Sequence, residues 1–225
     1  MSNSHEFSFD ILKARQREIR DGFPESLGLR THRALSWLKR AEQEAEDDDA
    51  CFIFLWIAFN AAYAQEISNV EDLSEHRVQV DFLQRLIDCD QQQLLYTLVW
   101  DQYSGPIRLL IDNRYVFQPF WRFQLGQLEE AKWQQLFDGS KKSAHKALRE
   151  IDTRKILAVM FDRLYVLRNQ LMHGGATWGS GVNRSQVKDG ANILGQVVPV
   201  IIHLMMEHPK KDWGEPCYPV VEVVS

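Results

Sequence analysis

The sequence predicts an all-α protein: an up-and-down bundle of about four long helices, with smaller helices inserted between the second and the third. Three observations support this fold class. Apolar residues recur at spacings of three and four along most of the chain, no segment sustains the alternation typical of strands, and acidic, glycine or proline turns separate the helical stretches. With 225 residues, 45% of them hydrophobic, the chain is long enough to bury a core.

The chain begins with a polar segment and continues into two long helices. Residues 1–25 are mixed in charge and are expected to form an N-terminal arm or a short leading helix. The first long helix is predicted from Ser26, a good helix-capping residue, to the acidic run EAEDDD at 44–49. The same acidic run should stabilise the N-terminus of a second helix, residues 50 to about 66. Because its sequence CFIFLWIAFNAAYA is apolar nearly all round, this helix should be buried.

The region at about 90–150 is predicted to be an insertion of smaller helices. A helix is expected at about 76–88, before the insertion, and another at about 91–101. The segment 104–138 is interrupted by Gly105-Pro106, Asn113-Arg114 and Gln118-Pro119, so an irregular helical structure is expected there. For the stretch YVFQPFWRFQ, residues 115–124, an extended conformation is the alternative prediction. A further helix is predicted over 140–150.

Two long helices should complete the domain, which we place at residues 26–208. One covers 151–173, has Asp152 and Thr153 near its start, and is stopped by Gly174 and Gly175. The other covers about 187–208 and contains the longest apolar run, 193–206, which is shorter than a membrane span and is expected to be a core helix bent at Pro199. The tail, 209–225, either pairs as a short strand or packs loosely.

Composition limits the classes of function. The net charge of −5 gives no overall attraction for nucleic acid, so contact with RNA would require local basic patches. The three cysteines are odd in number and widely spaced, which favours neither a disulfide framework nor a zinc site, and the histidines lack metal-ligand spacing. We therefore expect no metal and no cofactor. The N-terminus lacks the apolar core of a secretory signal, so a cytoplasmic location is expected.

The octapeptide RNQLMHGG, residues 168–175, carries the main candidate site. On an ideal helix Arg168 falls inside the apolar face, between Leu164 and Met172, where a guanidinium needs hydrogen-bond partners. Asn169 lies one turn before His173 and can contact it. Arg168 and His173 point about 140° apart, so a second copy of the helix across a two-fold axis would be needed to complete a cluster.

Arginine and histidine together suit phosphoryl transfer without a metal. Histidine can move protons near neutral pH, and arginine stabilises the charge of the transition state. Without further context, the same pattern is explained by a capping histidine and a structural arginine. A small-molecule phosphoryl enzyme is a poorer explanation, because the sequence has no phosphate-binding glycine loop and no paired carboxylates.

The sequence resembles the HEPN superfamily of α-helical domains. The hallmark of that superfamily, R-x4-6-H with a polar residue after the arginine, is matched by Arg168, Asn169 and His173. The segments RTHRALSWLKRA (30–41) and FIFLWIAFNAAYA (52–64) resemble the Apea-like HEPN branch, in which a Trp-Ile-Ala-Phe-Asn type helix precedes the motif helix. The resemblance covers about residues 26–67 and 151–208 and leaves the insertion unmatched.

The resemblance implies a metal-independent endoribonuclease with a composite pocket between two facing copies. It makes His173 the general acid or base, Arg168 the transition-state clamp and Asn169 the orienting group, and it implies a 2′,3′-cyclic phosphate product. Active members of the superfamily are often toxins or phage-defence effectors, and a neutralising or regulatory protein is then a further partner. Inactive members imply the alternative, a non-catalytic module for dimerisation or for binding a partner protein or nucleotide.

Two further groups of residues are candidates on weaker grounds. Asn60 either bonds to the motif helix or is a satisfied core amide, and Arg33 and Trp37, one turn apart, either flank the site or are ordinary core and surface residues. A basic stripe at helical spacing either follows an RNA backbone or is a solvated helix face. It consists of Lys141, Lys142, His145, Lys146 and Arg149.

Overall fold

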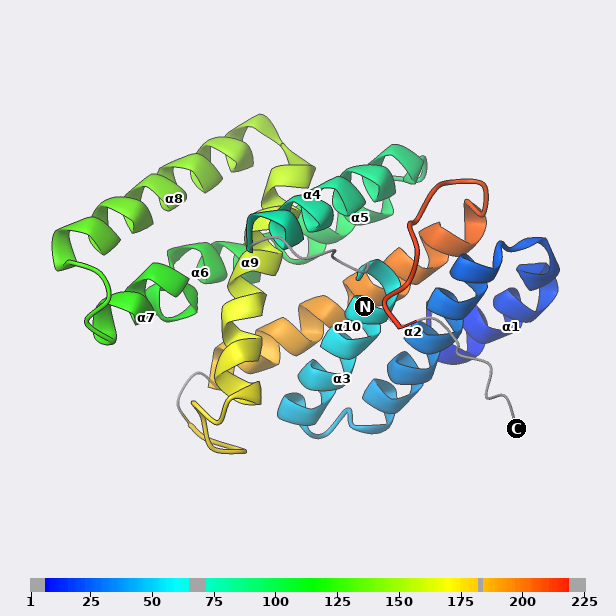
Figure 1. The fold of residues 1–225 in the computed structure, drawn as a ribbon, viewed down its shortest axis with the longest axis horizontal. Coiled ribbons are helices and arrows are strands. Elements are labelled where there is room, and N and C mark those ends of the chain that lie inside the picture. The colour runs from blue at the N-terminus through cyan, green and yellow to red at the C-terminus, as the bar shows by residue number, and fades with distance from the viewer. Residues whose placement is uncertain (1–6, 65–71, 182–183, 219–225) are drawn as a thin grey trace. The chain divides into compact units, whose positions relative to one another are not determined.

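The computed structural model describes residues 7–64, 72–181 and 184–218, and these residues are all-α (Figure 1). They form ten α-helices and no strand, which confirms the predicted fold class. The chain divides into two compact units: residues 1–91 with 194–225, and residues 92–193. We call them the first and the second unit. The predicted insertion and the octapeptide both lie in the second.

The first unit contains four N-terminal helices and the second part of α10. These are α1 (Phe9–Ile19), α2 (Glu25–Gln43), α3 (Asp48–Tyr63) and α4 (Asp72–Cys89), and α10 covers Arg184–Glu207. Helices α2 and α3 form a hairpin and lie side by side in Figure 1. The acidic turn between them behaves as predicted, because the Asp47 carboxylate accepts hydrogen bonds from the backbone N–H groups of Asp49 (3.0 Å) and Ala50 (3.1 Å).

Aromatic side chains fill the core of the first unit. Phe52 and Phe59 of α3 are fully buried, as expected for a helix that is apolar nearly all round. The Phe59 ring lies 4.5 Å from the Tyr63 ring, and the Phe82 ring of α4 lies 5.9 Å from the ring of Trp213. The segment after α10 therefore contributes a side chain to this core.

Both ends of the described chain are held on the first unit. The predicted arm contains α1, whose Leu12 is buried, and Arg15 on α1 forms an ion pair of 2.7 Å with Glu207 on α10. The C-terminal segment is held by Arg30 of α2, which is fully buried. The Arg30 guanidinium donates to the backbone carbonyls of Ala62, Ala64, Gly214 and Glu215, at 2.8–3.1 Å. The described part of the tail is thus anchored by side chains of α2.

The second unit contains the predicted insertion and the motif helix. Its helices are α5 (Leu94–Thr97), α6 (Ser104–Asp112), α7 (Gln118–Gln124), α8 (Glu130–Glu150), α9 (Thr153–Met172) and Arg184–Ile193 of α10. A π-helical turn covers Leu98–Gln102 and a 3₁₀ turn Arg114–Val116. The segment 115–124 is helical and not extended. Pro119 lies in the first turn of α7, where a proline costs no hydrogen bond.

Helix α8 begins ten residues earlier than the sequence pattern predicts. Its N-terminal half is exposed on most sides, so it lacks a continuous apolar stripe. A few aromatic contacts hold it instead. The Trp133 ring is buried and lies 5.2 Å from Phe120 of α7 and 5.9 Å from Phe123.

Helix α10 is the only helix in the described residues that is long and apolar enough to cross a membrane. In the structure, 72% of its most apolar stretch is buried, as is usual for a core helix. The helix continues through Pro199.

Candidate functional site

Helix α9 ends where the two glycines predict. At its start the Asp152 carboxylate accepts a hydrogen bond from the backbone N–H of Lys155 (3.0 Å). His173 is the C-terminal capping residue, and Gly174 has a φ of 70°, in the left-handed region that favours glycine. Gly175 donates its N–H to the carbonyl of Gln170 (2.8 Å), and an added Cβ there would lie only 3.1 Å from that oxygen. The glycine pair therefore stops the helix directly after His173.

Arg168 and Asn169 form a pair at this helix end. The Arg168 Nη1 donates to the Asn169 Oδ1 at 2.9 Å, and both side chains are half-buried. The imidazole of His173 is exposed and, among the described residues, makes no hydrogen bond. The expected contact from Asn169 to His173 is thus replaced by one to Arg168. The pair leaves the other guanidinium N–H groups of Arg168 available for an anion.

The open face of α9 differs from the prediction. Met172 is predicted on the apolar face but is 47% exposed, and its neighbour Leu171 is only half-buried. Arg168 lies at the edge of the covered side, because that side is rotated toward Arg163 and Val166, which are both buried. Tyr165, one turn before Arg168 and Asn169, is 41% exposed. An aromatic ring and a thioether therefore flank the Arg-Asn pair on the surface.

Arg163 is a buried cation that the sequence pattern does not predict. It is 3% exposed, its guanidinium carbon lies 4.5 Å from the centre of the Phe117 ring, and it donates to the hydroxyl of Ser140 at 3.0 Å. Burial lowers the pKa of Arg163 to about 10. Its contacts join α9 to α8 and to the segment before α7, so its role in this unit is structural.

A pocket in the second unit adjoins the motif helix. It has a volume of about 430 Å³, and we call it the Tyr115 pocket. The Gln170 amide of α9 donates to the backbone carbonyl of Tyr115 at 2.7 Å, which ties the pocket wall to the helix between Arg168 and His173. Exposed apolar groups of Leu109 and Tyr115 lie beside amides and carboxylates. The lining residues are Leu109, Leu110, Asp112, Asn113, Tyr115, Ser185, Gln186 and Asp189.

The predicted basic stripe forms an open hollow on α8. We call it the α8 hollow; its volume is about 600 Å³ and it is lined by Asp138, Lys141, Lys142, His145 and Arg149. The Lys141 ammonium and the His145 Nε2 lie 3.5 and 3.2 Å from the Asp112 carboxylate. Lys146 instead pairs with Glu150 (3.6 Å) and does not line the hollow. Within the described chain Lys142 and Arg149 form no ion pair, so their charges are available to a ligand.

The α8 hollow, the Tyr115 pocket and the motif helix are joined by consecutive contacts. Asp112 lines the Tyr115 pocket and also contacts two residues of the α8 hollow. Tyr115, which also lines this pocket, accepts a hydrogen bond from Gln170 of α9 through its backbone carbonyl. The second unit therefore presents positive charge, an aromatic ring and the Arg-Asn-His group along one chain of neighbouring residues.

The three supporting candidates lie in the first unit. Arg33 donates to the carbonyls of Cys217 (3.1 Å) and Tyr218 (2.8 Å), so it helps to hold the tail. Trp37 stacks on Phe54 with ring centres 5.8 Å apart, and Asn60 is a half-buried residue in the last turn of α3. These contacts account for Arg33 and Trp37 without a ligand.

In the described residues, no group of three or more His, Cys, Asp or Glu side chains could hold a metal ion. No model of a known protein family matches the chain, and neither does a curated protein or a solved structure. Function is therefore inferred from the residues and their geometry.

Proposed function

We propose that the protein is a metal-independent endoribonuclease of the HEPN type, and that its site is the Arg168-Asn169-His173 group of α9. One observation carries the proposal. A guanidinium paired with a neutral amide, and not with a carboxylate, lies at an open helix end one turn from an exposed histidine. An unneutralised arginine next to a histidine is suited to a phosphodiester and its transition state.

The reaction needs only the groups of the RNA and of this site. The 2′-hydroxyl attacks the adjacent phosphorus, and a neutral His173 accepts its proton. The new bond joins the 2′-oxygen to phosphorus, and the bond to the 5′-oxygen breaks. The imidazolium of His173 formed in this way gives its proton to the departing 5′-oxygen, which leaves a 2′,3′-cyclic phosphate, a 5′-hydroxyl and a neutral His173. The Arg168 guanidinium stabilises the extra negative charge on the phosphoryl oxygens, and Asn169 orients it.

A second copy of the chain completes the site in this proposal. Arg168 and His173 of one copy point in different directions on the helix, whereas two helix ends across a two-fold axis would place the arginine of one copy near the histidine of the other. The exposed Tyr165 and Met172 would supply the apolar contact of this homodimer. The interface would then be the open face of α9.

RNA would approach along the second unit. Lys142 and Arg149 of the α8 hollow would contact phosphates, and the exposed ring of Tyr115 would stack on a base. Such an enzyme acts in the cytoplasm, as a toxin or a phage-defence effector, and its activity requires restraint by a neutralising or regulatory protein.

The test is cleavage of a mixed RNA by the purified full chain in the presence of EDTA. We expect cleavage with 2′,3′-cyclic phosphate ends, no cleavage of DNA of the same sequence, and a loss of at least about 100-fold in His173→Ala. Arg154→Ala, an exposed arginine of the same helix, is the matched control and should retain activity. Cleavage that EDTA abolishes, or that His173→Ala retains, would contradict the mechanism.

The dimer is tested separately. Met172→Glu should give a monomer by sedimentation and should lose cleavage with its fold intact, because it places a charge in the proposed interface. Leu136→Glu, at a 40% exposed position of α8, is the control. Cleavage by a monomer would rule out a composite site.

The alternative is a non-catalytic module that dimerises or binds a partner protein or nucleotide through the same helix. The exposed Tyr165 and Met172 favour it, since such side chains are common in protein interfaces. It predicts no cleavage of any RNA and an effect of Met172→Glu on association alone.

A further inference from the structure

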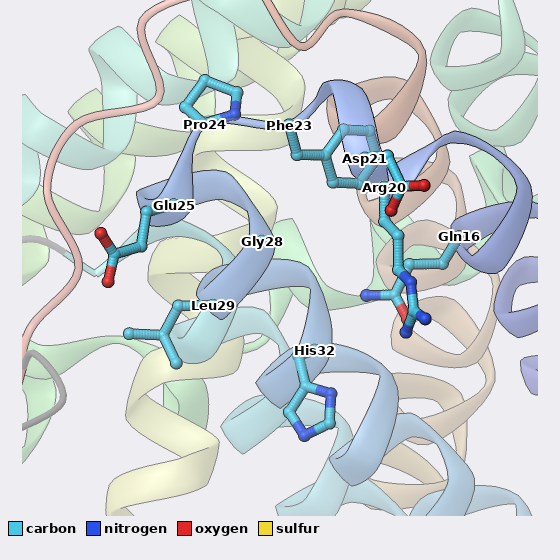
Figure 2. Close-up of a pocket in the computed structure, with 9 residues that line it drawn as sticks. All are labelled: Gln16, Arg20, Asp21, Phe23, Pro24, Glu25, Gly28, Leu29 and His32. Atoms are coloured by element: carbon cyan, nitrogen blue, oxygen red, sulfur yellow. The ribbon is translucent and has the colours of Figure 1, made fainter.

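The first unit contains a pocket of its own between α1 and α2, which we call the α1–α2 pocket (Figure 2). It has a volume of about 480 Å³, within the usual range for small-ligand sites. Phe23 and Pro24, from the turn that joins the two helices, provide an apolar wall. Gly28 of α2 lines the pocket without a side chain, and a Cβ added there would meet no atom within 4 Å.

Three cations gather along α1 and the 3₁₀ turn that follows it. They are Lys13, Arg17 and Arg20, and in the described part of the chain none of them forms an ion pair with a carboxylate. Burial, together with the positive charges of Arg17 and Arg20, lowers the pKa of Lys13. Like charges this close repel each other, so an anion between them would be bound favourably.

Gln16 fixes the geometry at the base of this cluster. Its side chain is buried, with 3% exposure, and lines the α1–α2 pocket. The amide Nε2 donates to the hydroxyl of Thr31 on α2 (3.2 Å), and the Oε1 accepts from the ammonium of Lys13 (2.6 Å). The two walls are therefore connected through polar contacts of Gln16, and the Lys13 ammonium is bonded to one of the lining residues.

The Arg20 and Glu25 side chains lie at opposite ends of the pocket. In Figure 2 the side chains of Arg20 and His32 extend toward the same end of the pocket, and the carboxylate of Glu25 lies at the opposite end. Asp21, the other acidic lining residue, is exposed and is drawn next to Arg20 in Figure 2, but it forms no ion pair with Arg20. One end of the pocket is thus suited to an anion and the Phe23-Pro24 side to an apolar group.

We propose that the α1–α2 pocket binds a small phosphate ester that carries a ring or a similar apolar group. Arg20 and His32 hold the phosphate, and Phe23 and Pro24 contact the apolar part. The site belongs to the first unit and does not depend on ribonuclease activity. It gives the chain a ligand in addition to RNA.

The proposal is tested by calorimetric titration of the full-length His173→Ala protein, so that any RNA cleavage is removed from the measurement. The probes are adenosine 5′-monophosphate, inorganic phosphate and adenosine. We expect the monophosphate to bind more tightly than phosphate, and adenosine to bind at least about tenfold more weakly than the monophosphate, since charge-assisted hydrogen bonds are lost.

Two variants test the phosphate contact and the volume of the α1–α2 pocket separately. Arg20→Gln should weaken binding of the monophosphate at least about tenfold. Gly28→Leu should prevent binding by filling the pocket, and its fold should persist because the added side chain meets open space in a helix. Arg77→Gln, at an exposed position of α4, is the charge-matched control and should bind normally.

Three outcomes would overturn the proposal: no saturable binding of phosphate or the monophosphate at millimolar concentration, equal binding of adenosine and the monophosphate, or normal binding by both Arg20→Gln and Gly28→Leu. RNA cleavage without ligand binding would contradict only this proposal. Ligand binding without RNA cleavage would contradict only the proposed function.

Discussion

Each of the two compact units contains a buried arginine, and the two are accommodated differently. Arg30 in the first unit is fully buried and donates to four backbone carbonyls. Arg163 in the second unit donates to one hydroxyl and, at 3.5 Å, to the backbone carbonyl of Ile111; it lies against two phenyl rings, and its Nε finds no acceptor among the described residues. Burial of a cation costs least where acceptors saturate it, so Arg30 should contribute far more to stability than Arg163.

The largest effect is expected for Arg30→Ala. It leaves four carbonyls without their donor, opens a cavity and releases the described part of the tail from α2, so the free energy of unfolding should fall by about 3–5 kcal/mol. Urea denaturation followed by circular dichroism measures this. The matched substitution is Arg163→Met, which places an apolar chain between two rings and should change stability by no more than about 1 kcal/mol. Equal losses in the two variants would contradict the comparison.

Arg168→Ala should separate function from stability in the second unit. Because Arg168 is half-buried and, among the residues that the structure describes, is bonded only to its neighbour Asn169, we expect a stability change under about 0.5 kcal/mol. Cleavage should fall at least about 100-fold, or about 2.7 kcal/mol in the activation free energy. Single-turnover cleavage and thermal melting of the same sample provide both values. A large loss of stability would assign Arg168 a structural role like that of Arg30.

Tyr115→Ala should have a smaller and more selective effect. The exposed ring lines the Tyr115 pocket, whereas its backbone carbonyl binds Gln170, so the substitution removes the ring and keeps the contact to α9. KM for RNA should rise about fivefold to tenfold with kcat nearly unchanged, since stacking on one base contributes about 1–3 kcal/mol. Trp178→Ala, which removes another exposed aromatic ring of the second unit, is the control. A fall in kcat would instead indicate that Tyr115 positions the motif helix.

The smallest effect concerns the ion pair between Arg15 and Glu207. The hydrogen bond from Arg15 lowers the pKa of the Glu207 carboxyl in the folded chain, so the pair stabilises the protein above the usual glutamate pKa and loses this contribution as the pH falls through the lowered value. Because both side chains are partly exposed, the contribution should stay below about 1 kcal/mol. Arg15→Gln should lose stability at pH 7 and match the unsubstituted protein near pH 2. A loss that persists at pH 2 would indicate packing instead.

The sequence predicts the features of this fold that depend on interactions between residues close together in the chain. Helical periodicity, the caps at Asp47 and Asp152, and the stop at Gly174 and Gly175 depend on residues within one turn of each other. The roles of Arg30 and Arg163 are not visible in this way, because their acceptors lie up to 185 positions away. A long side chain that binds carbonyls far away in the chain produces no periodic pattern in the sequence.

The sequence predicts only part of the candidate site, because some of its features are local and others are formed by segments far apart in the chain. The end of α9 and the exposed position of His173 follow from the glycine pair. The ideal-helix projection wrongly assigns Met172 to the buried side of α9. Periodicity identifies the apolar face of a helix, but it does not indicate which turn extends beyond the helices that pack against it. The Tyr115 pocket is formed by α6, a 3₁₀ turn and α10, segments whose proximity no local motif encodes.

The anchoring of the tail by α2 has a consequence for variation of the sequence. Arg30 and Arg33 bind the carbonyl oxygens of Glu215, Cys217 and Tyr218, atoms that every amino acid possesses. These hydrogen bonds therefore depend on the path of the main chain and not on the side chains of the residues bound. Replacements at these three positions should leave the attachment intact, whereas a change at Arg30 removes its contacts to Gly214 and Glu215 together, and a change at Arg33 removes those to Cys217 and Tyr218.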